Sequence, residues 1–142
     1  MTALMALLLT IGVGAIAVIH VAWGLGSHWP EASEEALARS VVGDGRRRMP
    51  PAWQCFLVAL VLAVMALWPW YVLGRIDQPA VLAGTYMIAG IFAARGIAGF
   101  SHRWKAHFTI EPFATRNRRY YSPYCLLLGV GYIALVAGEL DK

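Results

Sequence analysis

The sequence predicts an all-α integral membrane protein whose single domain, residues 1–142, is a four-helix transmembrane bundle. Hydrophobic residues make up 59% of the chain and charged residues only 14%, which lies well outside the balance of a soluble domain. The apolar residues also gather in four runs, each near or above the length of about 20 residues that crosses a bilayer, at 3–25, 52–73, 80–100 and 120–138. No polar linker or low-complexity tract divides the chain, so we expect one compact unit.

The first run is interpreted as a retained span and not as a secretion signal. No Lys or Arg precedes Arg39, so the basic leading region of a signal is missing, and the apolar core is longer than that of a signal. The loop that follows carries the signals of a short surface helix. Ser33 is a favoured N-cap residue. Glu34 and Glu35 suit the positive end of a helix dipole, and Gly43 is suited to end the helix.

The second span is expected to begin after Pro51 and to end in an aromatic belt, because Trp68, Trp70 and Tyr71 suit the membrane interface. Pro69 lies so near the end of this span that we expect it to bend the helix without breaking it.

The third span begins after Asp77, near Pro79. It holds Gly90, Ala94 and Ala98 at four-residue spacing, which lets neighbouring backbones approach closely. We therefore expect this span to be the central packing helix of the bundle.

An interfacial segment at 101–119 is predicted before the fourth span. Its aromatic residues Trp104 and Phe108 alternate with Arg103 and Lys105, a pattern that suits a helix lying at the lipid surface.

The fourth span follows the interfacial segment. Ser122 is the expected N-cap residue and Pro123 the expected first helical residue, inside a cluster of tyrosines at the interface.

Basic residues are distributed unevenly between the two sides of the predicted membrane. Because successive spans alternate in direction, the loops at 26–51 and 101–119 share one side, while both termini and the link around Arg75 share the other. The second side holds only Arg75 and Lys142. The first side holds Arg39, Arg46, Arg47, Arg48, Arg103, Lys105, Arg116, Arg118 and Arg119. The positive-inside rule therefore predicts cytoplasmic basic loops, with both termini outside.

The loop cations predict contact with the bilayer and its anionic lipids. Five of them are the expected headgroup contacts, namely Arg46, Arg47, Arg48, Arg103 and Lys105. Each cation near an acidic leaflet gains on the order of 1 kcal/mol, although such runs also simply enforce topology. No recognition helix or aromatic-basic sheet pattern accompanies the net charge of +4, so nucleic acid is not an expected partner.

Arg95 is the single charge inside any predicted span, where a cation is costly. His20 lies at matching depth, because both residues stand about five positions before the end of their span, roughly 7 Å below the interface. Two interpretations stay open. Either Arg95 snorkels to the headgroups while His20 makes an interhelical hydrogen bond, or the two form a cationic site. In such a site the counter-charge comes from Glu31, from Glu111 or from an anionic ligand.

Cys55 and Cys125 fall near the same depth, so we expect His20, Cys55, Arg95 and Cys125 to form one layer. The three residues His20, Cys55 and Cys125 are conceivable zinc ligands, but the paired ligand spacing of structural zinc sites is absent. The alternative is that both cysteines are reduced and act as small apolar residues.

Haem ligation by two histidines has weak support, because only His20 lies inside a predicted span and one of His28, His102 or His107 would have to fold inward. We therefore expect no cofactor.

Three stretches carry a resemblance to a known family. They begin at His20, at Arg95 and at Tyr121, and they contain the motifs His-x-x-Trp-Gly, Arg-Gly and Tyr-Ser-Pro-x-Cys. The combination resembles the bacterial family known as domain of unknown function 3995, over nearly the whole chain. The resemblance implies a four-span protein without an established activity. We expect the protein to lie in a bacterial inner (cytoplasmic) membrane. The resemblance also implies that the motifs concentrate at the cytoplasmic ends of the spans, so Trp23, His28, Tyr121 and Ser122 join Arg95 and His20 in the candidate site.

The leading functional hypothesis is a non-enzymatic membrane protein. Its cytoplasmic mouth, lined by His20, Trp23, Arg95 and Tyr121, binds an anionic headgroup or a small amphipathic ligand. One alternative is an accessory subunit that docks through its small-residue third span, in a homo-oligomer or a larger membrane complex.

A second alternative is a membrane enzyme that uses His20 as acid or base, assisted by Cys55 or Cys125. No Gly-rich phosphate loop, nucleophile elbow or carboxylate pair accompanies these residues.

Overall fold

The computed structural model describes residues 1–141, and Lys142, which the charge pattern places on the same side as Arg75, lies outside this range. Four helices in the described part are long and apolar enough to cross a membrane. They are α1 (Thr2–Gly24), α3 (Ala52–Val72), α4 (Pro79–Phe100) and a helix built from α6 (Phe113–Arg116), the π-helical η1 (Asn117–Tyr121) and α7 (Ser122–Leu140). Two short helices lie in the loops, α2 (Glu34–Val41) and α5 (His102–His107). The prediction of an all-α membrane bundle is confirmed.

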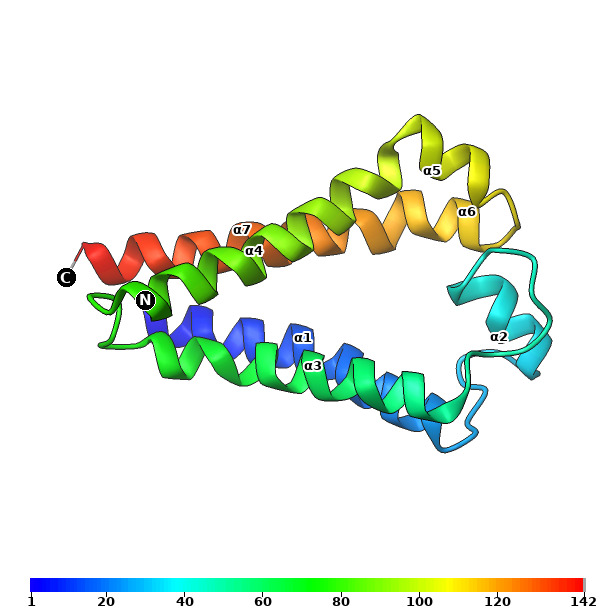
Figure 1. The fold of residues 1–142 in the computed structure, drawn as a ribbon, viewed down its shortest axis with the longest axis horizontal. Coiled ribbons are helices and arrows are strands. Elements are labelled where there is room, and N and C mark those ends of the chain that lie inside the picture. Colours follow the sequence, from blue (N-terminus) through cyan, green and yellow to red (C-terminus); the bar gives the residue numbers. More distant parts are fainter. Residues whose placement is uncertain (142) are drawn as a thin grey trace.

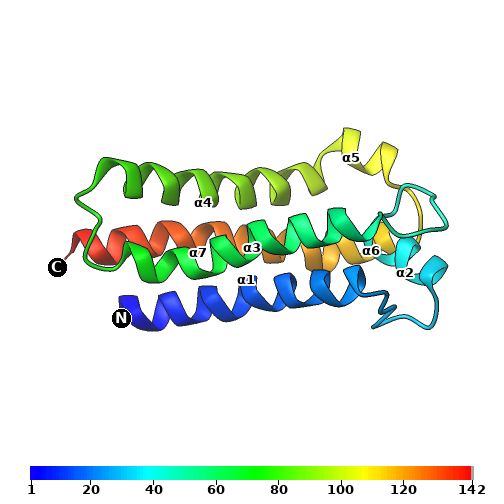
Figure 2. The ribbon, with the colours of Figure 1, turned by 60° about the horizontal axis from the view of Figure 1, so that its bottom comes forward.

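The long helices form two antiparallel pairs, α1 with α3 and α4 with α7 (Figure 1). The pairs lie closest near the two chain ends and diverge toward the end that carries α2, α5 and α6. Figure 2 shows that the N- and C-terminal ends lie at the same end of the bundle. We call this the termini end, which includes the link at 73–78. The opposite end, with the loops at 25–51 and 101–112 and the helix turns beside them, is the loop end.

Pro69 interrupts the hydrogen bonding of α3, and the neighbouring helices repair the interruption. Proline has no N–H to donate to the carbonyl of Met65, four residues earlier. The hydroxyl of Tyr132 in α7 donates to this carbonyl at 2.6 Å, and Thr10 in α1 donates to the carbonyl of Ala66 at 2.8 Å. α3 therefore continues unbroken past Pro69, as expected, and the proline becomes a point where three helices are bonded together.

α2 forms where the sequence predicts it. The Ser33 hydroxyl accepts a hydrogen bond at 3.2 Å from the backbone N–H three residues later, and Glu34 and Glu35 occupy the first turn. Gly43 adopts φ +73°, and its N–H donates to the carbonyl of Ala38 at 3.2 Å. This is the left-handed helix ending that glycine favours.

The fourth long helix begins earlier than predicted. It starts at Phe113 and not near residue 120, and Ser122 lies fully buried within it instead of capping its start. The real start signals are Pro112 before the first turn and the carboxylate of Glu111, which accepts a hydrogen bond from the N–H of Thr115. The arginines at 116–119 give this stretch the composition of a loop, yet they stand at the loop end of a helix. The predicted interfacial helix is consequently limited to α5.

α4 packs through a different small-residue face from the predicted one. Gly90 has no atom within 4 Å of the position where a Cβ would stand, and Ala94 is exposed. The close approach occurs instead at Gly129 of α7, whose Cβ position lies 3.1 Å from the carbonyl oxygen of Ala89. α4 therefore packs closely against α7 through small residues. It packs little against α3, so it is not the central helix of the bundle.

Candidate functional site

Arg95 is half-buried at the loop end of α4, between α5 and the fourth long helix. Its Nη2 donates to the Asn117 Oδ1 at 2.9 Å, and its guanidinium lies over the Trp104 ring, 4.5 Å from the ring centroid. Arg95 Nη1 and Trp104 Nε1 are both buried and have no hydrogen-bond acceptor among the described residues. An unsatisfied buried donor costs about 1–3 kcal/mol. These two donors are therefore an energetic cost that the described residues do not offset.

Asn117 connects Arg95 to the rest of the fold. Its side chain is buried, and its Oδ1 also accepts a hydrogen bond from the Ser122 hydroxyl at 3.2 Å. Its Nδ2 donates to the Gly99 carbonyl at 3.3 Å. Both lone pairs of the amide oxygen are thus used, and Arg95 is held in one orientation by a neutral group that leaves its charge uncompensated.

Two glycines of α4 allow this network to form. A Cβ on Gly99 would lie 1.8 Å from the Ser122 Oγ, and a Cβ on Gly96 would lie 2.9 Å from the Ser122 carbonyl oxygen. The facing helix is π-helical over η1, a geometry that occurs frequently at functional sites. Residues at the two ends of η1 consequently reach different neighbours, Asn117 toward α4 and Tyr121 toward α2.

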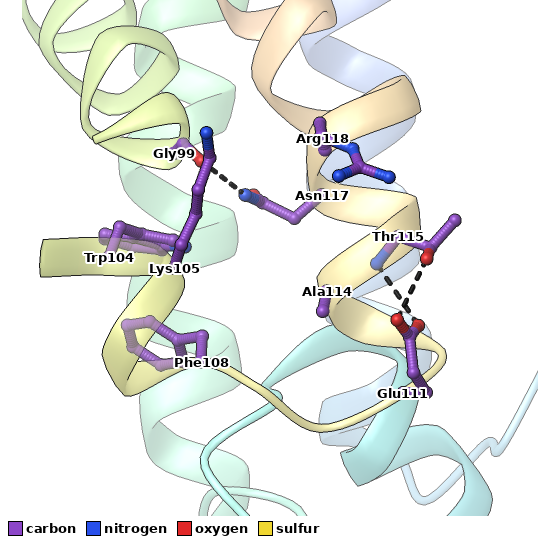
Figure 3. A pocket seen from close by; sticks show the side chains of 9 residues that line it. All are labelled: Gly99, Trp104, Lys105, Phe108, Glu111, Ala114, Thr115, Asn117 and Arg118. Carbon is purple, nitrogen blue, oxygen red and sulfur yellow. Dashed lines mark hydrogen bonds between the residues drawn. The ribbon is translucent and has the colours of Figure 1, made fainter. Parts of the chain in front are cut away.

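A cavity of about 180 Å³ lies beside Arg95, between α5 and the start of the fourth long helix (Figure 3). Trp104 and Asn117 both contact Arg95 and both line the cavity. Figure 3 shows the rings of Trp104 and Phe108 on the α5 side, facing the helix that carries Asn117. The remaining lining residues are Gly99, Lys105, Glu111, Ala114, Thr115 and Arg118.

No carboxylate forms an ion pair with Arg95 within residues 1–141. Glu31, one of the two predicted counter-charges, pairs instead with Arg116. Glu111, the other, accepts hydrogen bonds from the N–H and the hydroxyl of Thr115, at 3.2 and 2.9 Å. Neither of the two predicted carboxylates therefore pairs with Arg95, and an anionic ligand stays a prediction.

His20 and Trp23 lie on α1, in the other helix pair. The His20 Nδ1 is 2.8 Å from the Ile16 carbonyl of its own helix, so this nitrogen carries a proton and donates it to the carbonyl. The His20 and Trp23 rings are 4.9 Å apart, and the Trp23 Nε1 donates to the Trp29 carbonyl at 2.8 Å. The structure records no contact of these two side chains with Arg95.

The remaining predicted site residues are Ser122, Tyr121 and His28, and only Ser122 is bonded to the network of Arg95. Ser122 joins Arg95 through Asn117. The Tyr121 hydroxyl donates to the Ser40 carbonyl at 3.1 Å and so attaches the fourth long helix to α2. His28 is exposed in the loop after α1.

The two cysteines have free thiols. Cys55 is buried in α3 and Cys125 is half-buried in α7. Among residues 1–141, no group of three His, Cys, Asp or Glu is arranged to hold a metal ion.

The predicted headgroup cations occupy the loop end. Arg46 pairs with Asp44 at 2.6 Å, and this neighbouring guanidinium lowers the pKa of the Asp44 carboxyl below its ordinary value. Arg47 lies 3.8 Å from Glu35, while Arg48 and Arg103 are exposed. Lys105 is the member of this set that lines the cavity beside Arg95.

Several cavity residues were not predicted as members of the site. Asn117, Phe108 and Arg118 belong to a stretch that its composition assigned to the interface, and Trp104 was recognised only as part of that pattern. One available signal is the proline at 112 after an acidic residue, which marks a helix start. Starting the helix there would have placed Asn117 within it and one turn before Ser122.

The fold defines a multi-pass membrane protein with four spans. The chain belongs to the family described as protein of unknown function (DUF3995), whose model matches residues 13–132. This match covers the three motif stretches and confirms the resemblance drawn from them. Searches of the curated proteins and of the solved structures find no match to this chain.

Proposed function

We propose that this protein is a non-enzymatic membrane protein that binds an anionic headgroup, or a small amphipathic anion, at Arg95. The main support is that Arg95 Nη1 and Trp104 Nε1 are neighbouring buried donors with no acceptor in the described chain. A bound anion supplies both hydrogen-bond acceptors and the counter-charge. Hydrogen bonds to charged partners are about twice as strong as neutral ones.

The site is preorganised for such a ligand. Asn117 and the Trp104 ring hold the guanidinium from two sides, so little side-chain freedom is lost on binding. Ile97 and Phe100 are exposed on the same end of α4 and offer an apolar surface to acyl chains. This arrangement supports a narrower site than the predicted mouth, because His20 and Trp23 make their hydrogen bonds within their own segment.

Substitution of Arg95 tests the proposal. Arg75 provides a matched control, because it too lies over an aromatic ring, 4.9 Å from the Tyr71 centroid, but at the termini end. The purified protein is exchanged into nanodiscs that contain phosphatidylglycerol and phosphatidylcholine, and retained lipid is counted by native mass spectrometry. Arg95→Gln should reduce retention of the anionic lipid at least about tenfold, equivalent to ~1.4 kcal/mol, and Arg75→Gln should leave it unchanged. Equal retention in both variants would refute the site.

We also propose that the loop end faces the cytoplasm of a bacterial inner membrane, because the basic residues concentrate there. A cysteine introduced at Gly45 should then be protected from a membrane-impermeant thiol reagent in intact cells. A cysteine introduced at Asp77 should be labelled. The reverse pattern would invert the orientation.

A further inference from the structure

The cavity beside Arg95 carries charges of both signs. Lys105 and Arg118 line it together with the carboxylate Glu111, and Arg95 contacts the lining residues Trp104 and Asn117 without lining the cavity itself. In Figure 3 the Lys105 chain and the Arg118 guanidinium lie toward Gly99, while the Glu111 carboxylate lies toward the opposite end of the cavity. A simple anion would use only the basic end.

Glu111 keeps acceptor capacity for a ligand. The structure gives its two oxygens hydrogen bonds from one residue, Thr115, at 3.2 Å and 2.9 Å. A carboxylate offers about four lone-pair sites, so further donors can be bound. Within the described residues, neither Lys105 nor Arg118 forms an ion pair with Glu111.

Aromatic rings cover one wall between the two ends. The Trp104 and Phe108 ring centroids lie 4.4 Å apart, and both rings line the cavity. Aromatic faces attract ammonium groups as well as guanidinium groups. The cavity volume of about 180 Å³ is an order of magnitude above the roughly 15 Å³ that one water needs, so a group of several heavy atoms fits.

We propose that the ligand of this site is a phosphoethanolamine group, with its phosphate at the Lys105 and Arg118 end, on the side of the Arg95 network, and its ammonium at Glu111. This inference rests on the proposed function and specifies its ligand. A zwitterion matches both ends of the cavity, whereas phosphatidylglycerol or free phosphate leaves the Glu111 carboxylate facing uncompensated negative charge. The same group occurs in a membrane lipid and in small soluble molecules.

The test compares two lipids in one protein. Full-length protein in nanodiscs is offered equal amounts of phosphatidylethanolamine and phosphatidylglycerol with identical acyl chains, and the ratio of the two retained lipids is measured. The wild type should prefer phosphatidylethanolamine by at least about threefold, the effect of one accessible ion pair. Glu111→Gln should abolish or reverse this preference, while Glu35→Gln, at an exposed glutamate that does not line the cavity, should preserve it. Because the ratio is taken within each variant, a loss of folded protein does not change it.

Competition by soluble compounds separates the sources of the group. Displacement of the lipid by phosphoethanolamine, but not by inorganic phosphate, supports the inference and indicates a free ligand. Failure of both compounds, with the lipid preference intact, supports it and indicates a lipid. A wild-type preference for phosphatidylglycerol, or an unchanged ratio in Glu111→Gln, would overturn the inference while leaving anion binding at Arg95 standing. Loss of neither lipid in Arg95→Gln would instead overturn the proposed function.

Discussion

The two ends of this bundle treat buried polar groups in opposite ways. At the termini side of the bundle, the carbonyl freed by Pro69 receives the Tyr132 hydroxyl, and Thr10 both donates to Ala66 and accepts from Trp70 at 2.9 Å. At the loop end, Arg95 and Trp104 each retain a buried donor without an acceptor in the described chain. In the first region the freed backbone group is satisfied by neighbouring helices, whereas in the second two buried donors are left unsatisfied by the described residues.

The difference follows the arrangement of the helices. Around Pro69 the hydroxyls of Thr10 and Tyr132 join α1, α3 and α7. Toward the loop end the two helix pairs diverge, and the network around Arg95 stays within α4, α5 and the fourth long helix. Hydrogen bonds between the helix pairs thus lie toward the termini end, and the proposed binding site lies at the loop end.

The largest effect is expected where the loop-end network is most tightly packed. In Gly99→Ala the new Cβ would lie 1.8 Å from the Ser122 Oγ, so α4 must move away from the fourth long helix. Overpacking of this kind costs about 1–3 kcal/mol, and lipid binding should fall with it. Unfolding in detergent measures the loss. Gly90→Ala is the control on the same helix, because its Cβ meets nothing within 4 Å. Equal stability of the two variants would contradict the packing at Gly99.

The next largest loss of stability is expected when the hydrogen bond that compensates for Pro69 in α3, toward the termini end, is removed. Tyr132→Phe leaves the Met65 carbonyl without a donor and should cost about 1–2 kcal/mol of unfolding free energy. In a Pro69→Ala background the backbone N–H is restored, so the same substitution should cost clearly less. A double-mutant cycle measured by unfolding gives this difference. Identical costs in both backgrounds would show that Tyr132 does not act through the proline.

The smallest effect is expected at the exposed Asp44–Arg46 pair. Arg46 lowers the pKa of Asp44 from its ordinary value of 3.8, so the pair stabilises the fold above that pH and ceases to do so as pH falls through the lowered value. Asp44→Asn should therefore lose about 0.2–1 kcal/mol at neutral pH and nothing at strongly acidic pH. Thermal unfolding at both pH values checks this. A difference that persists in acid would assign the effect to something other than the charge.

Local signals predicted much of the fold. The four spans follow from apolar length, and α2 follows from Ser33 and Gly43, because each signal acts within a few residues. The start of the fourth long helix was missed because arginines at a helix end resemble a loop. That error hid Asn117, although Arg95 and Ser122 on either side of it were identified.

The lateral arrangement of the site was beyond the sequence. Counting residues from a span end gives the depth of His20 and of Arg95 but not the distance between them. Their helices belong to different pairs, and this depends on which faces of α1 and α4 pack. Their equal depth in the membrane therefore predicted one site, whereas in the structure His20 and Arg95 make their hydrogen bonds in separate networks.

Arg95 has no carboxylate partner among the described residues, and we propose that it binds an anion instead. The substitution Asn117→Asp tests this proposal most directly. The substitution keeps the oxygen that accepts from Arg95 and Ser122, gives up the 3.3 Å bond to the Gly99 carbonyl, and places a negative charge beside the guanidinium. We expect retention of phospholipid to fall at least about tenfold in native mass spectrometry, while the unfolding midpoint stays within a few degrees of the wild type. Undiminished lipid retention in a folded Asn117→Asp protein would contradict the account.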